Sequence, residues 1–213
     1  MKVGILFSGR GSNMSAIIRA AIDPSYEVEI AAVVCNRPNA PGIEIAREQG
    51  HMAIVIDHRE FDRREDHENA VSAALKERGV QLVCLAGYMR ILSETFLTAW
   101  RGRVVNVHPS LLPAFRGVDT HERALERGCR IHGCTVHYVN AELDGGPIIA
   151  QAAVPILGND DADALSERVL ACEHELYPEC IAMIARGEVR WSNGSVVISR
   201  KVSSERLSLG VGG

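Results

Sequence analysis

The sequence has no long hydrophobic run, no excess of basic residues and no basic-then-apolar leader pattern at its start. Its longest uninterrupted apolar run, Leu82 to Met89, is far shorter than the ~20 residues that a membrane span needs. The 23 basic residues are outnumbered by 27 acidic residues, which gives a net charge of −4 and argues against nucleic-acid binding. We therefore expect a cytoplasmic protein without a secretory leader, membrane partner or nucleic-acid partner.

Cysteine pairs spaced as C-x-x-C are also absent. His132 and His137 flank Cys134, but the four-ligand spacing of a zinc site is missing, so we expect no metal. The chain has six cysteines, several of them inside apolar runs, which is typical of buried or incidental thiols in a reducing compartment. They are Cys35, Cys84, Cys129, Cys134, Cys172 and Cys180.

Short apolar runs alternate with longer amphipathic stretches in the first half of the chain. This pattern predicts an α/β fold with a mostly parallel, twisted, Rossmann-like sheet and helices on both faces. With 213 residues, 46% of them hydrophobic, the chain is long enough for a sizeable core. The predicted strands are 2–7, 28–34, 52–56, 81–86 and 103–108, and the predicted helices are 12–21, 41–50 and 61–78.

The second half changes character. Residues 133–139 and 148–154 flank a turn-rich stretch, which favours an antiparallel addition to the sheet. A long helix is predicted over 162–186, kinked or interrupted at Pro178. Asn193-Gly194 predicts a hairpin, and we expect a flexible tail from Ser203. We accordingly divide the chain into one domain, 1–188, and a C-terminal extension, 189–213.

The first candidate site is the glycine-containing loop Ser8 to Asn13, between a predicted strand and a predicted helix. Main-chain N–H groups at such a turn, with the helix dipole behind them, suit a phosphate. A dinucleotide site would require a glycine where Met14 stands and an acid where Asn36 stands, and a Walker lysine is also missing. The loop therefore indicates a small phosphate monoester, although a tight strand–helix turn would look the same.

The second candidate site lies at the end of the strand 103–108. Asn106 and His108 are two residues apart, so their side chains share one face of the strand and could stabilise an oxyanion. Asp144 precedes Gly145-Gly146-Pro147, a common turn sequence, and matters for chemistry only if it folds back onto His108. No serine stands in G-x-S-x-G, which argues against a Ser/His/Asp hydrolase.

Taken together, these motifs resemble the folate-dependent formyltransferase family, over about residues 1–188. The resemblance implies a one-carbon transferase that moves the formyl group of 10-formyltetrahydrofolate to the amine of glycinamide ribonucleotide in purine biosynthesis, without a metal. It rests on the segments 9–13, 61–65, 89–92, 106–113, 133–139, 143–147 and 173–174.

The resemblance also implies roles for individual residues. Asn106, His108 and Asp144 match the catalytic residues. Gly11, Ser12 and Asn13 match the segment that holds the substrate phosphate, and Glu173 matches an acid on the ribonucleotide side. The folate side is implied for Arg64, Met89, Arg90, Ile91 and Leu92, with Asn106 and the backbone of Asn140, Ala141, Glu142, Leu143 and Asp144. Without the resemblance, 89–92 would fit a core stripe, and Arg64 and Glu173 would fit solvated helix faces.

Two related enzyme classes share the catalytic residues. Methionyl-tRNA formyltransferase carries a C-terminal RNA-binding domain, for which we expect no room, and formyltetrahydrofolate deformylase carries an additional N-terminal domain, which we do not expect here. A non-catalytic folate- or nucleotide-binding module is the remaining alternative. We expect a monomer or a homodimer.

Overall fold

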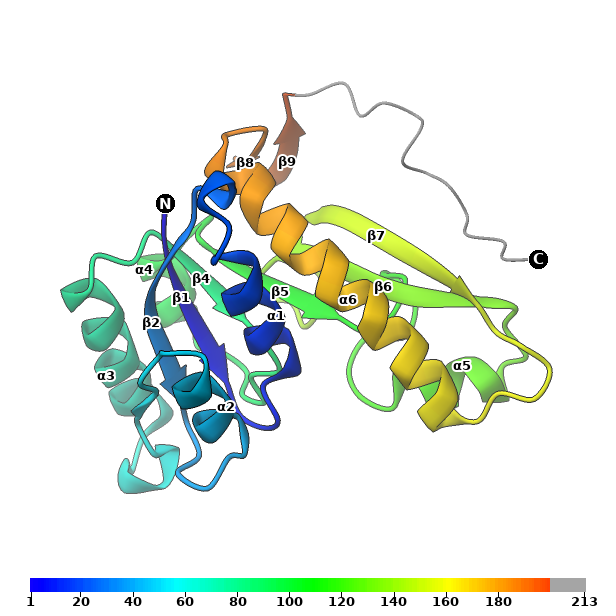
Figure 1. Cartoon of the computed structure of the whole chain (residues 1–213), viewed down its shortest axis with the longest axis horizontal. Coiled ribbons are helices and arrows are strands. Elements are labelled where there is room, and N and C mark those ends of the chain that lie inside the picture. Colours follow the sequence, from blue (N-terminus) through cyan, green and yellow to red (C-terminus); the bar gives the residue numbers. More distant parts are fainter. Residues whose placement is uncertain (200–213) are drawn as a thin grey trace.

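The structure, a computed structural model, describes residues 1–199, and the predicted tail from Ser203 lies outside this range. Within it, one sheet has the strand order β3-β2-β1-β4-β5-β6-β7 (Figure 1). The first five strands are parallel and the last two are antiparallel, as the sequence predicts. They are β1 (Lys2–Phe7), β2 (Glu29–Cys35), β3 (Ile54–Val55), β4 (Leu82–Leu85), β5 (Val104–His108), β6 (Ile131–Tyr138) and β7 (Ile148–Pro155).

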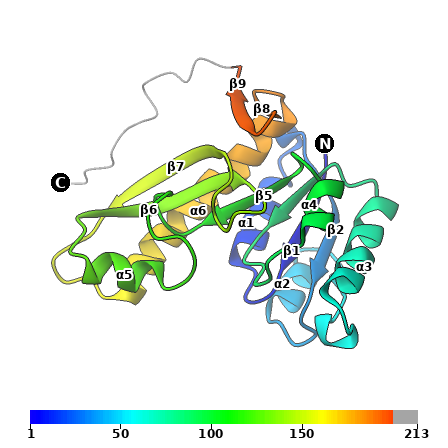
Figure 2. The same ribbon diagram turned by 180° about the vertical axis from the view of Figure 1, so that it is seen from behind.

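Helices cover both faces of the sheet (Figures 1 and 2). One face packs against α1 (Ser12–Ala20), α2 (Gly42–Glu48) and α6 (Ala162–Ala185), around a large apolar core. The other face packs against α3 (Arg64–Glu77) and α4 (Glu94–Ala99), around a smaller core. A further helix, α5 (Thr120–Glu126), lies beside α6, and two short 3₁₀ turns cover Pro24–Tyr26 and His58–Glu60. No helix within residues 1–199 is long and apolar enough to cross a membrane.

The sequence predicts a kink or an interruption at Pro178, and the structure excludes the interruption, because α6 runs through this residue without a break. Proline removes one helix hydrogen bond, but the neighbouring Tyr177 and Ile181 are completely buried against the sheet, and this packing holds the helix on both sides. The Pro178 carbonyl also accepts a hydrogen bond from the Tyr26 hydroxyl at 2.7 Å. The helices α4 and α5 were not predicted.

The predicted hairpin is present as β8 (Val189–Ser192) and β9 (Ser195–Ile198). Its turn residues, Asn193 and Gly194, have φ values of 49° and 83°, as a two-residue hairpin turn requires. The Trp191 ring packs on Gly102, where an added Cβ would lie 2.8 Å from the ring. The guanidinium of Arg101 lies 5.4 Å from the ring centroid. The hairpin is thereby attached to the turn that precedes β5.

Candidate active site

Asn106 on β5 and His137 on β6 are direct cross-strand partners. The Asn106 Nδ2 lies 3.3 Å from His137 Nε2, and His137 Nδ1 lies 3.0 Å from the Tyr138 carbonyl, to which it donates. Burial lowers the pKa of His137, against the opposing effects of the Tyr138 carbonyl and Asp144. The ring is therefore neutral near pH 7, and its Nε2 accepts a hydrogen bond from Asn106. This contact fixes which end of the Asn106 amide is the donor.

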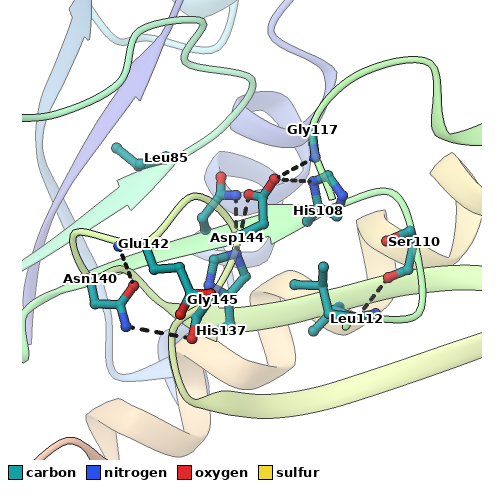
Figure 3. Close-up of polar contacts among 12 residues, drawn as sticks. Leu85, His108, Ser110, Leu112, Gly117, His137, Asn140, Glu142, Asp144 and Gly145 are labelled. Carbon is teal, nitrogen blue, oxygen red and sulfur yellow. Dashed lines mark hydrogen bonds and ion pairs between the residues drawn. The ribbon is translucent and has the colours of Figure 1, made fainter. Parts of the chain in front are cut away.

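Asp144 lies between two imidazole rings (Figure 3). Its Oδ2 is 3.5 Å from His108 Nδ1, and its Oδ1 is 3.9 Å from His137 Nε2. The main-chain N–H of Gly117 donates to Oδ2 at 2.9 Å. The other ring nitrogen of His108, Nε2, donates to the Phe115 carbonyl at 3.0 Å. The turn at Asp144 therefore folds back onto His108, which was the condition for a chemical role.

The backbone around Asp144 explains why glycines follow it. The connection between β6 and β7 leaves the sheet after Tyr138 and returns over the strands, with Asp144 in the left-handed region at φ 48°. At Gly146, an added Cβ would lie 1.7 Å from the Tyr138 carbonyl oxygen, so no side chain fits there. The tight return of the chain places the Asp144 carboxylate over β5.

A buried threonine fixes the loop that follows His108. Thr135 lies opposite His108 in the β5–β6 register, and its hydroxyl donates to the Ser110 carbonyl at 2.7 Å. The same hydroxyl accepts from the Leu112 N–H at 3.0 Å and from Gln151 Nε2 at 2.9 Å. Gln151 also donates to the Leu112 carbonyl at 2.8 Å. These bonds restrain the loop next to the imidazole.

The glycine loop and Glu173 meet in space although they are far apart in the sequence. Gly11 has φ 73° at the start of α1, and no side chain caps the first turn of this helix, whose first N–H groups have no partners within the helix. Asn13 Nδ2 donates to Glu173 Oε2 at 2.6 Å, while the Asn13 Oδ1 is buried and has no hydrogen-bond partner among residues 1–199. Burial raises the pKa of Glu173, and the bond from Asn13 opposes this shift.

The segment after β4 carries both exposed and buried side chains. Met89 and Ile91 are 64% and 63% exposed, which excludes a simple core stripe, while Leu92 is buried in the smaller core. Arg64 begins α3, and its side chain is 45% exposed. Arg90 is half-buried. The predicted folate-side residues Asn140, Ala141, Glu142 and Leu143 lie on the exposed connection between β6 and β7, where the Glu142 carboxylate pairs with Arg116.

His137 and Thr135 were missed as site residues by the sequence reasoning. Both lie on β6, and both become relevant only through the register that places them opposite Asn106 and His108. Alternation along 131–138 groups them on one face of a strand, but it does not reveal which strand is the neighbour. The pairing partner is therefore the information that the sequence lacked.

Comparison with known proteins identifies formyltransferases as relatives of this chain. The formyl transferase family model matches residues 1–181. The phosphoribosylglycinamide formyltransferase of Escherichia coli K12 is 40% identical over 89% of this chain and 90% of its own. The crystal structure of glycinamide ribonucleotide transformylase 1 from Symbiobacterium toebii has a TM-score of 0.90 and 42% identity, covering 94% of both chains.

A longer relative matches over only part of its length. The trifunctional purine biosynthetic protein adenosine-3 of Gallus gallus is 43% identical over 89% of this chain, which spans 19% of that protein. The similarity therefore covers one segment of a multifunctional polypeptide, and nearly all of the bacterial enzyme.

Proposed function

The chain belongs to the formyl transferase family, and from this membership we propose that it transfers the formyl group of 10-formyltetrahydrofolate to the amine of 5′-phosphoribosylglycinamide in de novo purine biosynthesis. The products are 5′-phosphoribosyl-N-formylglycinamide and tetrahydrofolate. The observation that carries this proposal is the Asp144 carboxylate 3.5 Å from His108, on the same strand face as Asn106. As both substrates are small soluble molecules, we infer a cytoplasmic enzyme.

Asn106 and His108 are suited to the oxyanion of the reaction. Attack of the substrate amine on the formyl carbon gives a tetrahedral intermediate, whose oxygen carries negative charge. The Asn106 amide can donate to this oxygen because its orientation is set by His137. His108 in its charged form supplies a second, charge-assisted hydrogen bond. An oxyanion at Nε2 would replace or share the Phe115 carbonyl as acceptor.

Asp144 has two tasks in the proposed reaction. The attacking amine must lose a proton, and the folate nitrogen that leaves must gain one. The Asp144 carboxylate can hold a water molecule for this transfer, and it stabilises positive charge on His108. Its bond from Gly117 keeps one carboxylate oxygen directed at the His108 ring.

The two substrates would occupy neighbouring parts of one site. We assign the phosphate to the N–H groups of Gly11, Ser12 and Asn13 at the start of α1, and the ribose side to Glu173, which Asn13 contacts. We assign the folate to the exposed Met89 and Ile91 with Arg64, Arg90 and Leu92, and to the backbone of 140–144. Holding both molecules side by side would supply much of the rate acceleration.

The decisive experiment is a formyl-transfer assay with the purified chain. We expect 10-formyltetrahydrofolate to be consumed only when 5′-phosphoribosylglycinamide is present, with tetrahydrofolate and the formylated ribonucleotide formed in equal amounts. Consumption of the folate without the ribonucleotide would instead indicate a deformylase. Binding of both substrates without any turnover would indicate a non-catalytic module.

A further inference from the structure

The segment Gly87 to Ser93 has no regular secondary structure, yet it carries the exposed Met89 and Ile91. Between β4 and α4, its Tyr88 and Leu92 side chains point into the smaller core. Buried apolar residues fix the depth of such a segment but leave its main chain free to rotate, since apolar contacts have no direction. The conformation of its main chain therefore depends on directional hydrogen bonds at its two ends.

The first end is held by Ser8, which directly follows β1. Its hydroxyl accepts the Met89 N–H at 2.9 Å and donates to Asn36 Oδ1 at 2.6 Å. Its own N–H donates to the Gly87 carbonyl at 3.1 Å. Ser8 and Asn36 are both buried. Asn36, at the position where a dinucleotide site has an acid, here orients Ser8, the first residue of the glycine-containing loop.

The second end is held by Glu68 on α3, whose side chain is only 5% exposed. Its carboxylate accepts the Ser93 N–H at 2.9 Å and also the Ser93 hydroxyl hydrogen. The Ser93 Oγ in turn accepts the Phe96 N–H at 3.2 Å and so caps α4. A buried carboxylate is costly unless it is hydrogen-bonded, and here both donors belong to Ser93. Arg64 Nε lies 4.0 Å from the Glu68 carboxylate.

From these two anchors we infer that Ser8 and Glu68 are positioning residues, which hold the segment 87–93 in the conformation that presents Met89 and Ile91 to the formyl donor. This inference rests on the proposed function. Neither residue belongs to the catalytic group on β5 and β6, so the anchors act on donor binding and not on the chemical step. Ser8 also connects the folate side to the loop Ser8 to Asn13, to which we assign the phosphate.

The test compares Glu68→Gln and Ser8→Ala with the wild type in steady-state kinetics for both substrates. We expect the KM for 10-formyltetrahydrofolate to rise about tenfold or more in each variant, because each loses a buried hydrogen bond to the segment. The kcat should stay within about threefold in both variants, and in Glu68→Gln the KM for the ribonucleotide should do so as well. Ser8→Thr keeps the hydroxyl and should restore the donor KM.

The matched control is Ser72→Ala. The Ser72 hydroxyl accepts the Trp100 Nε1–H at 3.0 Å, so this change also removes a buried hydrogen bond of α3 but leaves the segment untouched. It should lower the melting temperature without raising the donor KM. An equal rise in the control, or a loss of melting temperature alone in the two anchor variants, overturns the inference.

The Kd of tetrahydrofolate, measured by calorimetry, tests the two anchors independently of formyl transfer. If the wild type transfers no formyl group, the proposed function fails, and the Kd of tetrahydrofolate for wild type and variants still decides whether the anchors act. Should Glu68→Gln not fold, Ser8→Ala and Ser8→Thr decide alone. An unchanged Kd in Ser8→Ala would overturn the inference.

Discussion

At the scale of single residues, Asp144 has two imidazoles and one main-chain N–H around its carboxylate. Asp144→Asn keeps the shape but removes the charge. We expect kcat to fall about 100-fold or more, since the proposed proton transfer depends on this carboxylate. The KM values should change much less. Single-turnover kinetics measure the chemical step directly, and a rate within threefold of wild type would exclude the assigned role.

The contact between Asn106 and His137 predicts strong coupling between these two residues. Asn106→Ala removes one oxyanion donor and should lower kcat about 100- to 1,000-fold. His137→Phe removes the acceptor that orients the amide, so it should lower kcat by a smaller factor. Because His137 acts through Asn106, the double variant should be no slower than Asn106→Ala alone. Additive losses in this double-mutant cycle would show that His137 acts independently.

The sequence made part of this site predictable. Spacing alone places Asn106 and His108 on one strand face. The sequence also shows that Asp144 can take part in the chemistry only if its turn folds back onto His108. The left-handed backbone that brings Asp144 back, and the pairing that makes His137 a neighbour, depend on contacts between distant segments. Ser8 belongs to the first candidate loop, but its contact with Met89, 81 residues away, could not be foreseen for the same reason. Glu68 was not singled out, since its partner Ser93 lies 25 residues away.

At the scale of elements, the start of α1 gives a prediction about the phosphate. Gly11 and Gly50 both have positive φ, 73° and 83°, so alanine at either position costs about 1–2 kcal/mol of stability. An added Cβ at Gly11 would lie 2.8 Å from Met14 Cε and 3.2 Å from Gly42 Cα, whereas at Gly50 no atom of residues 1–199 lies within 4 Å. Gly11→Ala should therefore raise the KM for the ribonucleotide, with little effect on the folate KM.

Gly50→Ala is the control for this change, because Gly50 also has a positive φ but lies outside the loop to which we assign the phosphate. It should lower the melting temperature, though less than Gly11→Ala does because the added Cβ has no close contact, and should leave both KM values unchanged. If Gly11→Ala weakens both substrates equally, the phosphate does not bind at this loop.

The elements themselves were largely predictable, because alternating strands and helices leave a clear apolar pattern. The short helices α4 and α5 were not predicted, although the equally short α2 was, because six or seven residues display only a weak helical periodicity. The bond by which Ser93 caps α4 joins residues three apart, so the local sequence could suggest it. The contact of Ser93 with Glu68 on α3 could not be foreseen in this way. The order of the strands in the sheet was likewise not predicted.

At the scale of the whole molecule, buried histidines predict sensitivity to acid. Burial lowers the pKa of several histidines, and that of His132 falls to about 4. An unfolded histidine titrates near pH 6.5, so between about 6.5 and 4 the unfolded chain binds more protons than the folded one, and stability falls as pH falls. The histidines concerned are His67, His121, His132, His137 and His174.

Glu173 changes the stability with pH in the direction opposite to that of the histidines. Burial raises its pKa, so its contribution to stability is lost as pH rises through the folded value. Because the histidines outnumber it, we expect the melting temperature to drop steadily between pH 7 and pH 4.5. His132→Phe should make this dependence shallower, and calorimetry across the pH range measures both. A melting temperature that does not vary over this interval would contradict the prediction.

The contact of the hairpin with Gly102 has an optical consequence. The chain has two tryptophans, of which Trp100 is fully buried and Trp191 is partly exposed. Trp191 lines a surface cavity together with Asn140 and Ala141, on the connection where we place the folate. Its emission is thus sensitive to solvent and to the position of that connection, whereas Trp100 contributes a constant background. Occupancy of the folate side can then be followed as a change in emission wavelength, without any attached dye.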